Sequence, residues 1–287
     1  MKKSLFLTAI MISTLSAFEF HIGKGSYDTD ISIKEFLNHE TTNDIMVFTV
    51  QEPYKLISKS SLFYYYEAQL HTSTSKRQET EFANFAADYE FPLIGSANDM
   101  TNSFIGMFPV DGDYKAVGFD MNFGLGYDFY RNEGSYIGLA LNLGATLPLI
   151  NAENLTSKAS FTYDIIESWD LDVTTYKIGP AIKGNFAINP DFSLYGSFSF
   201  GFQKAAIESE LFKSSLDING NYSALDVGVS YQPGVSKYFF MFGHTAKRWQ
   251  VDSVEVNLFN FFKTDVFSPF TTKLKSNYTY LGAGYRF

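Results

Sequence analysis

The sequence predicts an all-β fold, a closed antiparallel up-and-down β-barrel of about ten strands that spans a membrane. Three observations support this fold: a long hairpin with strict period-two alternation, a regular alternation of long and short connections, and an aromatic content of 18%. Eight and twelve strands are the alternative counts.

The hairpin over residues 117–147 shows the alternation most clearly. Every second residue from Val117 to Phe129 is apolar or aromatic, and the pattern resumes from Ile137 to Leu147 after a short turn. Period two separates an apolar from a polar face of a strand. These strands are about twice the usual five or six residues, and their second face carries Gly, Asn and Asp. A tilted strand of about nine to eleven residues crosses a bilayer with apolar side chains outward, whereas a long β-sandwich strand is the alternative.

The first residues have the form of a secretory signal peptide. A basic start with Lys2 and Lys3 precedes an apolar segment at 5–12 and small residues up to Ala17. We therefore predict a signal peptide at 1–17 and a single mature barrel domain at 18–287. The chain has no cysteine, so disulfides, thiol nucleophiles, Cys-bound metals and a lipoprotein-type lipid anchor are not expected.

Composition narrows the class of protein further. No apolar run of eighteen or more residues follows the signal, which excludes a helical membrane protein. Removal of Lys2 and Lys3 changes the formal charge from −9 to −11, and an acidic chain is a poor candidate for nucleic-acid binding. The 30 Phe and 19 Tyr suit the aromatic girdles of a membrane barrel, whose alternating strands also agree with a mean hydropathy of −0.08.

The alternation predicts ten strands. They cover residues 18–22, 62–70, 83–91, 117–129, 137–147, 173–187, 192–203, 225–231, 238–249 and 277–287. The long connections are 26–60, 92–114, 150–171, 207–219 and 251–275, and the shorter ones are 72–80, 130–134, 188–191 and 232–236. Within the first connection, residues 45–48 could add strand above the membrane. A barrel with its amino terminus in the periplasm alternates long extracellular loops with short periplasmic turns, and the predicted order keeps that parity.

The last strand alternates apolar residues up to a terminal aromatic, with Leu281, Tyr285 and Phe287 on one face. This ending resembles the carboxy-terminal strand of bacterial outer-membrane β-barrel proteins. The resemblance implies that Leu281, Tyr285 and Phe287 form the signal read by the barrel-assembly machinery. It also implies a monomer in contact with outer-membrane lipid, with no named subfamily indicated.

No residue pattern predicts a catalytic, cofactor-binding or metal site, and we expect no enzyme activity. The ten-stranded omptin proteases place acidic pairs and a His–Asp pair at the extracellular rim, but no such motif surrounds the four histidines. His21 and His71 are expected near the periplasmic end. A rim hydrolase using His39 and His244 is the least favoured function.

Charged residues on the polar faces of the strands are predicted to line the lumen. They are Glu19, Glu67, Asp88, Glu90, Asp120, Asp128, Lys177, Lys183, Asp226 and Arg286. Charges removed from water are costly unless paired, so a filled interior with ion pairs is one interpretation. A small pore or a passage for small or apolar solutes is the other, with Phe104, Ile105, Met107 and Phe108 as a gating segment in the 92–114 loop. A non-transporting structural or surface-interaction barrel that works through its extracellular loops is the alternative function.

Overall fold

The computed structural model describes most of the chain. The described residues are 17–33, 37–57, 60–79, 81–82, 90–91, 95–96, 111–156, 169–209, 212–258, 262–264 and 270–286. The predicted signal peptide at 1–17 lies outside these residues except for Ala17. The predicted gating segment at 104–108, Asp88 and Phe287 also lie outside them. In the part of the chain that is described, no helix has the length and apolar character of a membrane span.

The fold is a closed antiparallel barrel, as predicted. Its ten wall strands are β1 (Ala17–Ile33), β2 (Leu37–Leu56), β3 (Leu62–Ser73), β8 (Asp111–Asn132), β9 (Ser135–Thr156), β10 (Trp169–Ala187), β11 (Phe192–Ser209), β12 (Phe212–Tyr231), β13 (Tyr238–Leu258) and β15 (Phe270–Arg286). Neighbours in sequence are neighbours in the wall, and β1 pairs with both β15 and β2, which closes the sheet.

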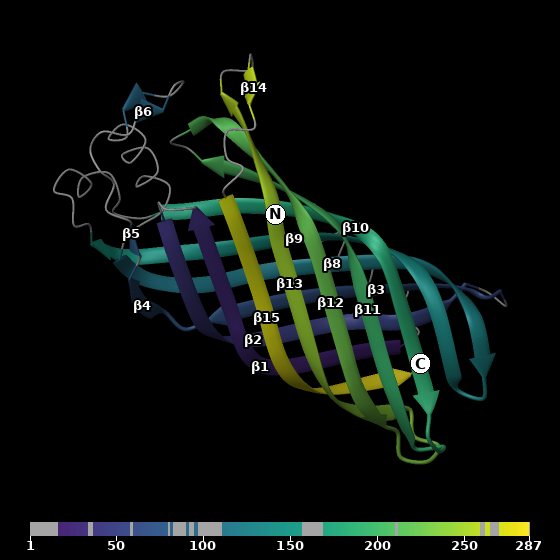
Figure 1. Cartoon of the computed structure of the whole chain (residues 1–287). Coiled ribbons are helices and arrows are strands. Elements are labelled where there is room, and N and C mark those ends of the chain that lie inside the picture. The colour runs from purple at the N-terminus through teal and green to yellow at the C-terminus, as the bar shows by residue number, and fades with distance from the viewer. Residues whose placement is uncertain are drawn as a thin grey trace, which may run out of the picture.

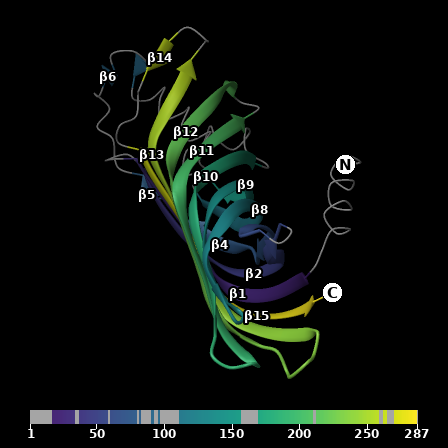
Figure 2. The same cartoon turned by 90° about the vertical axis from the view of Figure 1, so that its right-hand side faces the viewer.

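Five short strands lie outside this ring of ten. β4 (Lys76–Glu79) pairs with β8, β5 (Glu81–Phe82) with β2, and β14 (Phe262–Thr264) with β13, while β6 (Glu90–Phe91) and β7 (Gly95–Ser96) pair with each other. Figure 1 shows the tight turns and the end of β15 gathered at one end of the barrel, the turn end. Figure 2 shows β11, β12 and β13 rising towards β14 at the opposite end, the extended end.

The pairing register fixes the tilt of the strands. A row of paired residues starts at Ala187 and passes through Ser193, Ser230, Met241, Gly282, His21, Thr49, Gln69, Asp120 and Thr146 to Thr175. Ala187 and Thr175 both belong to β10, so one circuit of the barrel climbs by twelve residues. Ten strands with this offset tilt by about 40°, within the range of closed barrels.

The two faces of the wall follow the predicted alternation. On β8, Phe123, Leu125 and Tyr127 are 47%, 49% and 57% exposed on the outside. The residues between them, Gly124 and Gly126, are buried on the inside. A large apolar side chain exposed at every second position is the arrangement that a lipid-facing wall requires.

The first hairpin corrects the prediction of a long loop at 26–60. Residues 26–33 continue β1, and β2 occupies 37–56, paired to β1 from Leu37 to Gln51. The sequence signal is weak here because the inward face of β2 carries Ile45 and Val47 as well as polar residues. Both faces therefore contain apolar side chains, and the alternation that identifies a strand is lost.

The predicted strand at 83–91 is also wrong where it can be seen, because Glu90–Phe91 pairs only with Gly95–Ser96, outside the barrel sheet. Ten strands result nevertheless, since β2 replaces it. The other predicted long loops are shorter than expected: β9 continues to Thr156, β11 to Ser209, β13 to Leu258, and β15 begins at Phe270. Above the apolar belt both faces of a strand contact water or polar groups, so the period-two signal fades although the strand continues.

Candidate functional site

The centre of the barrel interior is bridged by Lys247 on β13. Its ammonium group donates to Glu67 Oε1 at 2.9 Å and to Asp120 Oδ2 at 2.8 Å, and it also contacts Gln69 Oε1. An ammonium has three N–H donors, and all three have an acceptor. Lys247, Gln69 and Asp120 are 6%, 2% and 2% exposed.

This contact crosses the lumen. Glu67 and Gln69 belong to β3, which is separated from β13 in the wall by β15, β1 and β2 on one side and by five strands on the other. Side chains from strands so far apart can meet only through the interior. The bond between Lys247 and β3 therefore obstructs the lumen at this level.

Asp120 on β8 holds the bridge in place. It accepts hydrogen bonds from Lys177 Nζ at 2.7 Å and Thr146 Oγ1 at 2.9 Å in addition to Lys247. Three donors satisfy a buried carboxylate, which would otherwise be costly to remove from water. Lys177 is 6% exposed. Two buried lysines, Lys177 and Lys247, therefore share the Asp120 carboxylate, and Glu67 supplies the second negative charge.

Neutral side chains make further connections across the interior. Tyr65 donates to Asn142 Oδ1 at 2.9 Å, and Asn142 donates to the Tyr222 hydroxyl at 3.2 Å, which links β3, β9 and β12. Tyr195 and Tyr280 share a hydrogen bond of 2.7 Å between β11 and β15. An aromatic and aliphatic cluster fills the space beside them: Tyr27, Ile45, Val47, Ala116, Tyr222, Trp249, Tyr278 and Tyr280.

A chamber of about 450 Å³ lies on the turn side of these bridges. Its lining includes the carboxylates of Glu19, Glu52, Glu67 and Asp226, with Lys183 as a cation. Arg286 lies at its mouth, with its guanidinium 5.2 Å from the centre of the Phe239 ring.

The charged residues predicted for the lumen, apart from Asp88, lie within the described part of the chain. Glu19 accepts from Gln51 at 2.7 Å, and Asp226 accepts from Thr245 at 2.8 Å and Tyr280 at 2.9 Å. Lys183 lies 3.7 Å from the centre of the Tyr65 ring. Asp128 is buried near the turn end, where it accepts from Arg131 Nε at 3.1 Å and contacts Tyr54. Glu90 does not belong to the barrel wall.

The two described residues of the predicted assembly signal, Leu281 and Tyr285, lie on or near the outer face, and Phe287 lies outside the described residues. Leu281 is 68% exposed among the outward side chains, and the Tyr285 ring packs 4.9 Å from Tyr238.

The histidines do not form the rim site considered above. His244 is exposed on the outer face, with its Nδ1 3.2 Å from Thr279 Oγ1. His39 is paired with Ile31 near the extended end of β2. His21 stacks on Tyr280 inside the barrel. His71 is further from the turn end than predicted, because the inclusion of β2 reverses the direction of β3. No group of three His, Asp or Glu side chains that could hold a metal occurs among the described residues.

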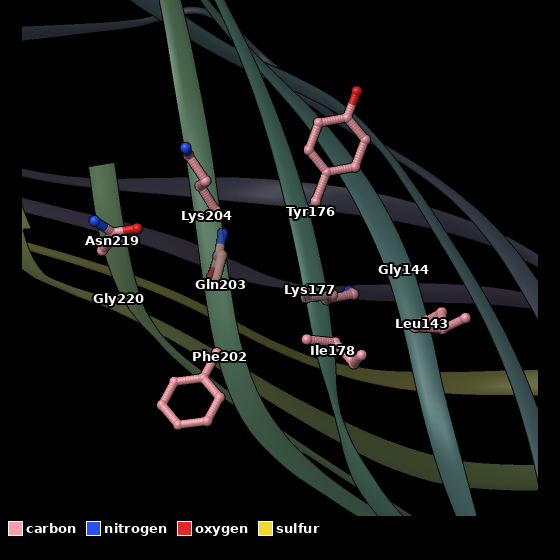
Figure 3. A pocket seen from close by; sticks show the side chains of 10 residues that line it. All are labelled: Leu143, Gly144, Tyr176, Lys177, Ile178, Phe202, Gln203, Lys204, Asn219 and Gly220. Carbon is pink, nitrogen blue, oxygen red and sulfur yellow. The ribbon is translucent and has the colours of Figure 1, made fainter. Parts of the chain in front are cut away.

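The outer wall carries a hollow of about 570 Å³ over β9 to β12. Figure 3 shows Tyr176 and Ile178 on β10 and Phe202 on β11 standing around it. The inward residues Lys177 and Gln203 also contribute to its lining, and because they are paired across β10 and β11, the wall is continuous at this point.

The comparisons with known proteins agree with this architecture. The model of the outer membrane protein beta-barrel domain family matches residues 65–287. The chain belongs to this family. The short turns and the end of β15 therefore face the periplasm, and the extended end faces the exterior. No curated protein matches the sequence.

Solved structures give the fold alone. The outer-membrane protease OmpT from Escherichia coli has a TM-score of 0.55 at 11% identity, over 96% of this chain and 98% of that one. The translocator domain of the autotransporter NalP from Neisseria meningitidis has a TM-score of 0.37 at 11% identity, over 100% and 95%. The toluene transporter TodX from P. putida has a TM-score of 0.31 at 7% identity, over 94% and 90%.

Sequence reasoning missed the residue at the centre of the network. Lys247 stands next to Arg248, and the segment 239–242 before them is apolar on both faces, so the pattern does not show which of the two cations points inward. The register of β13 decides it, because Thr245, Lys247 and Trp249 are buried while Arg248 is exposed.

Proposed function

We propose that this protein is a closed outer-membrane barrel that works through the surface it raises outside the membrane, and not as an open pore. The observation that carries the proposal is the bridge from Lys247 to Glu67, Gln69 and Asp120 across the lumen. Barrels near eight strands are filled by side chains, whereas open channels need about sixteen. Ten strands with an interior bonded from wall to wall belong with the filled class.

The length of the strands supports the proposal that the barrel works through a surface outside the membrane. About nine to eleven residues are enough to cross a bilayer, yet β2, β8 and β9 have 20, 22 and 22 residues. Above the apolar belt the outward residues of the first hairpin become polar, with Asp28 and Asp30 on β1 and Thr42 on β2. The wall therefore stands above the membrane as a rigid β-sheet surface suited to contact with other molecules.

The test is solute flux through vesicles that contain the refolded protein. Swelling in an osmotic gradient of a small sugar should equal that of protein-free vesicles if the barrel is closed. Swelling that increases with the amount of folded protein would refute the proposal. Folding is verified independently by the heat-dependent gel mobility that folded barrels show.

A second function, passage of apolar molecules, is favoured by the hollow in the outer wall. It faces the lipid side over β9 to β12, where β10 and β11 stay paired at Lys177–Gln203 and Ile178–Phe202. An apolar molecule could therefore bind there from the membrane, and it would reach the interior without using the bridged lumen only if these two strands separated. Transfer of an apolar dye into the vesicle interior above the protein-free rate would support this function, and an equal rate would exclude it.

A further inference from the structure

The lipid-facing surface of the barrel differs in polarity between opposite sides at the same depth. In a full circuit of ten strands, the row of paired residues shifts by twelve residues along the strands towards the extended end. In half a circuit of five strands it therefore shifts by six residues. The row passes from Gly282 to Thr146 in five steps. Thr279, three residues above Gly282, therefore lies level with Leu143, three residues below Thr146, on the opposite side of the barrel. Both side chains are exposed on the outer face.

Two more pairs follow by the same construction. Met241 and Asp120 are five steps apart, so His244 lies level with Phe123. His21 and Thr175 are five steps apart, so Lys24 lies level with Ile178. Phe123 and Ile178 are each 47% exposed. At each of these three levels, the β8–β10 side therefore presents Phe, Leu or Ile to lipid, and the opposite side presents His, Thr or Lys.

The polar residues form one continuous surface, which we call the seam notch because it covers the junction of β1 and β15. It consists of Lys24, Ser223, His244, Arg248, Lys275 and Thr279. His244 and Thr279 are paired across strands, as are Thr279 and Lys24. Below the notch the surface is apolar again, with Phe242 and Leu281 exposed at 54% and 68%. The notch therefore interrupts only the extracellular half of the apolar belt.

The charges of the notch identify what covers it. Arg248 and Lys275 are direct cross-strand partners on the outer face, and like charges in that position repel. Lys275 is also paired with Asp28 on β1, and Arg248 donates to Gln250 Oε1 at 3.1 Å, so the three cations of the notch face one directly paired carboxylate. No ion pair within the described residues engages Arg248, Lys275 or Lys24, and all three are exposed. A phosphate group placed between them would relieve the repulsion, since phosphate accepts charge-assisted hydrogen bonds from Arg and Lys.

We propose that the seam notch binds the phosphate-bearing headgroups of outer-leaflet lipids and draws them towards the bilayer centre beside the β1–β15 junction. A short apolar belt is accommodated by local thinning of the bilayer and by long cationic side chains that reach the headgroups. Lys24 and Arg248 supply such side chains, and His244 and Thr279 supply hydrogen-bonding groups below them. The notch thus selects anionic lipid and thins the outer leaflet on one side of the barrel.

The chain has no cysteine, so single-cysteine variants allow a matched test of depth. T279C and L143C, at the same level on opposite sides, are each labelled with an environment-sensitive dye in vesicles of phosphatidylcholine with phosphatidylglycerol. We expect the dye at position 279 to be quenched by aqueous iodide and the dye at 143 by lipids brominated in mid-chain. Equal quenching by mid-chain bromine at both positions would overturn the proposal.

The selectivity of the protein for anionic lipid tests whether the seam notch binds phosphate. Spin-labelled phosphatidylglycerol should associate with the wild-type protein more strongly than spin-labelled phosphatidylcholine. The triple variant K24Q/R248Q/K275Q should lose that preference, whereas K115Q/K204Q, which removes outward cations from β8 and β11, should keep most of it. An unchanged preference in the triple variant would refute phosphate binding. Disulfide-linked dimers of T279C would show that a second copy of the chain covers the notch, and would refute lipid as its occupant.

Discussion

Replacement of Lys247 by methionine should destabilise the folded barrel more than replacement of any exposed lysine. The variant K247M keeps the length and apolar stem of the side chain but removes the ammonium group that contacts Glu67, Gln69 and Asp120. Loss of one partner from a buried ion pair costs about 3–5 kcal/mol, because the remaining charge is left buried. Asp120 keeps Lys177 and Thr146 as donors, so we expect a loss near the lower limit, about 3 kcal/mol.

The assay is reversible urea unfolding in lipid vesicles, followed by the fluorescence of Trp249 in a W169F background, because the chain has two tryptophans. Trp249 lies two positions from Lys247 and is 6% exposed, so its emission reports local opening. The control is K273M, because Lys273 and Asp30 are 3.9 Å apart and each about one-third exposed. Such surface pairs contribute about 0–1 kcal/mol. Equal midpoints for wild type and K247M would refute the role of Lys247 as the central bridge.

A double-mutant cycle separates the ion pair from general loss of packing. If Lys247 and Asp120 act as one unit, the losses from K247M and D120N should not add, and the coupling should fall within about 0.5–3 kcal/mol. Additive losses would mean that the two residues stabilise the barrel independently.

Two further predictions concern packing and neutral hydrogen bonds inside the barrel. G126A should lower stability by about 1–3 kcal/mol, because a Cβ there would overlap the Phe63 ring and lie 2.6 Å from the Leu139 carbonyl oxygen. F63L should recover part of that loss, and unfolding midpoints for G126A equal to wild type would contradict the packing argument. N142L should cost about 1–3 kcal/mol by leaving Tyr65 and Tyr222 without their shared partner; the same urea assay measures it, and an unchanged midpoint would show that neither hydroxyl depends on it.

The class of fold could be predicted because lipid imposes a strict pattern. From β8 onward each strand crosses the belt with apolar side chains outward, so the hairpin at 117–147 and the strands after it were found in the correct order. The pattern fails where lipid is absent. The first hairpin extends above the belt and its interior holds Ile45 and Val47, so the sequence shows no contrast between its faces.

The interior site was predictable in its charges but not in its connections. Alternation assigns Asp120 and Lys177 to the polar face, yet which strands face each other across the lumen depends on closure and on the twelve-residue offset. Only these bring Lys247 on β13 against Glu67 on β3. The polar surface around Thr279 was not detected either, because its significance depends on comparison with Leu143 half a circuit away.

The closed lumen is the central claim, and single-channel conductance in a planar bilayer tests it most directly. Folded wild-type protein should give no steady conductance, whereas K247A combined with D120A, which removes both ends of the bridge, should give more frequent or larger openings. A stable conductance from the wild-type protein, lowered on neutralisation of Glu19 and Asp226 in the periplasmic chamber, would contradict the account and establish an open, carboxylate-lined pore.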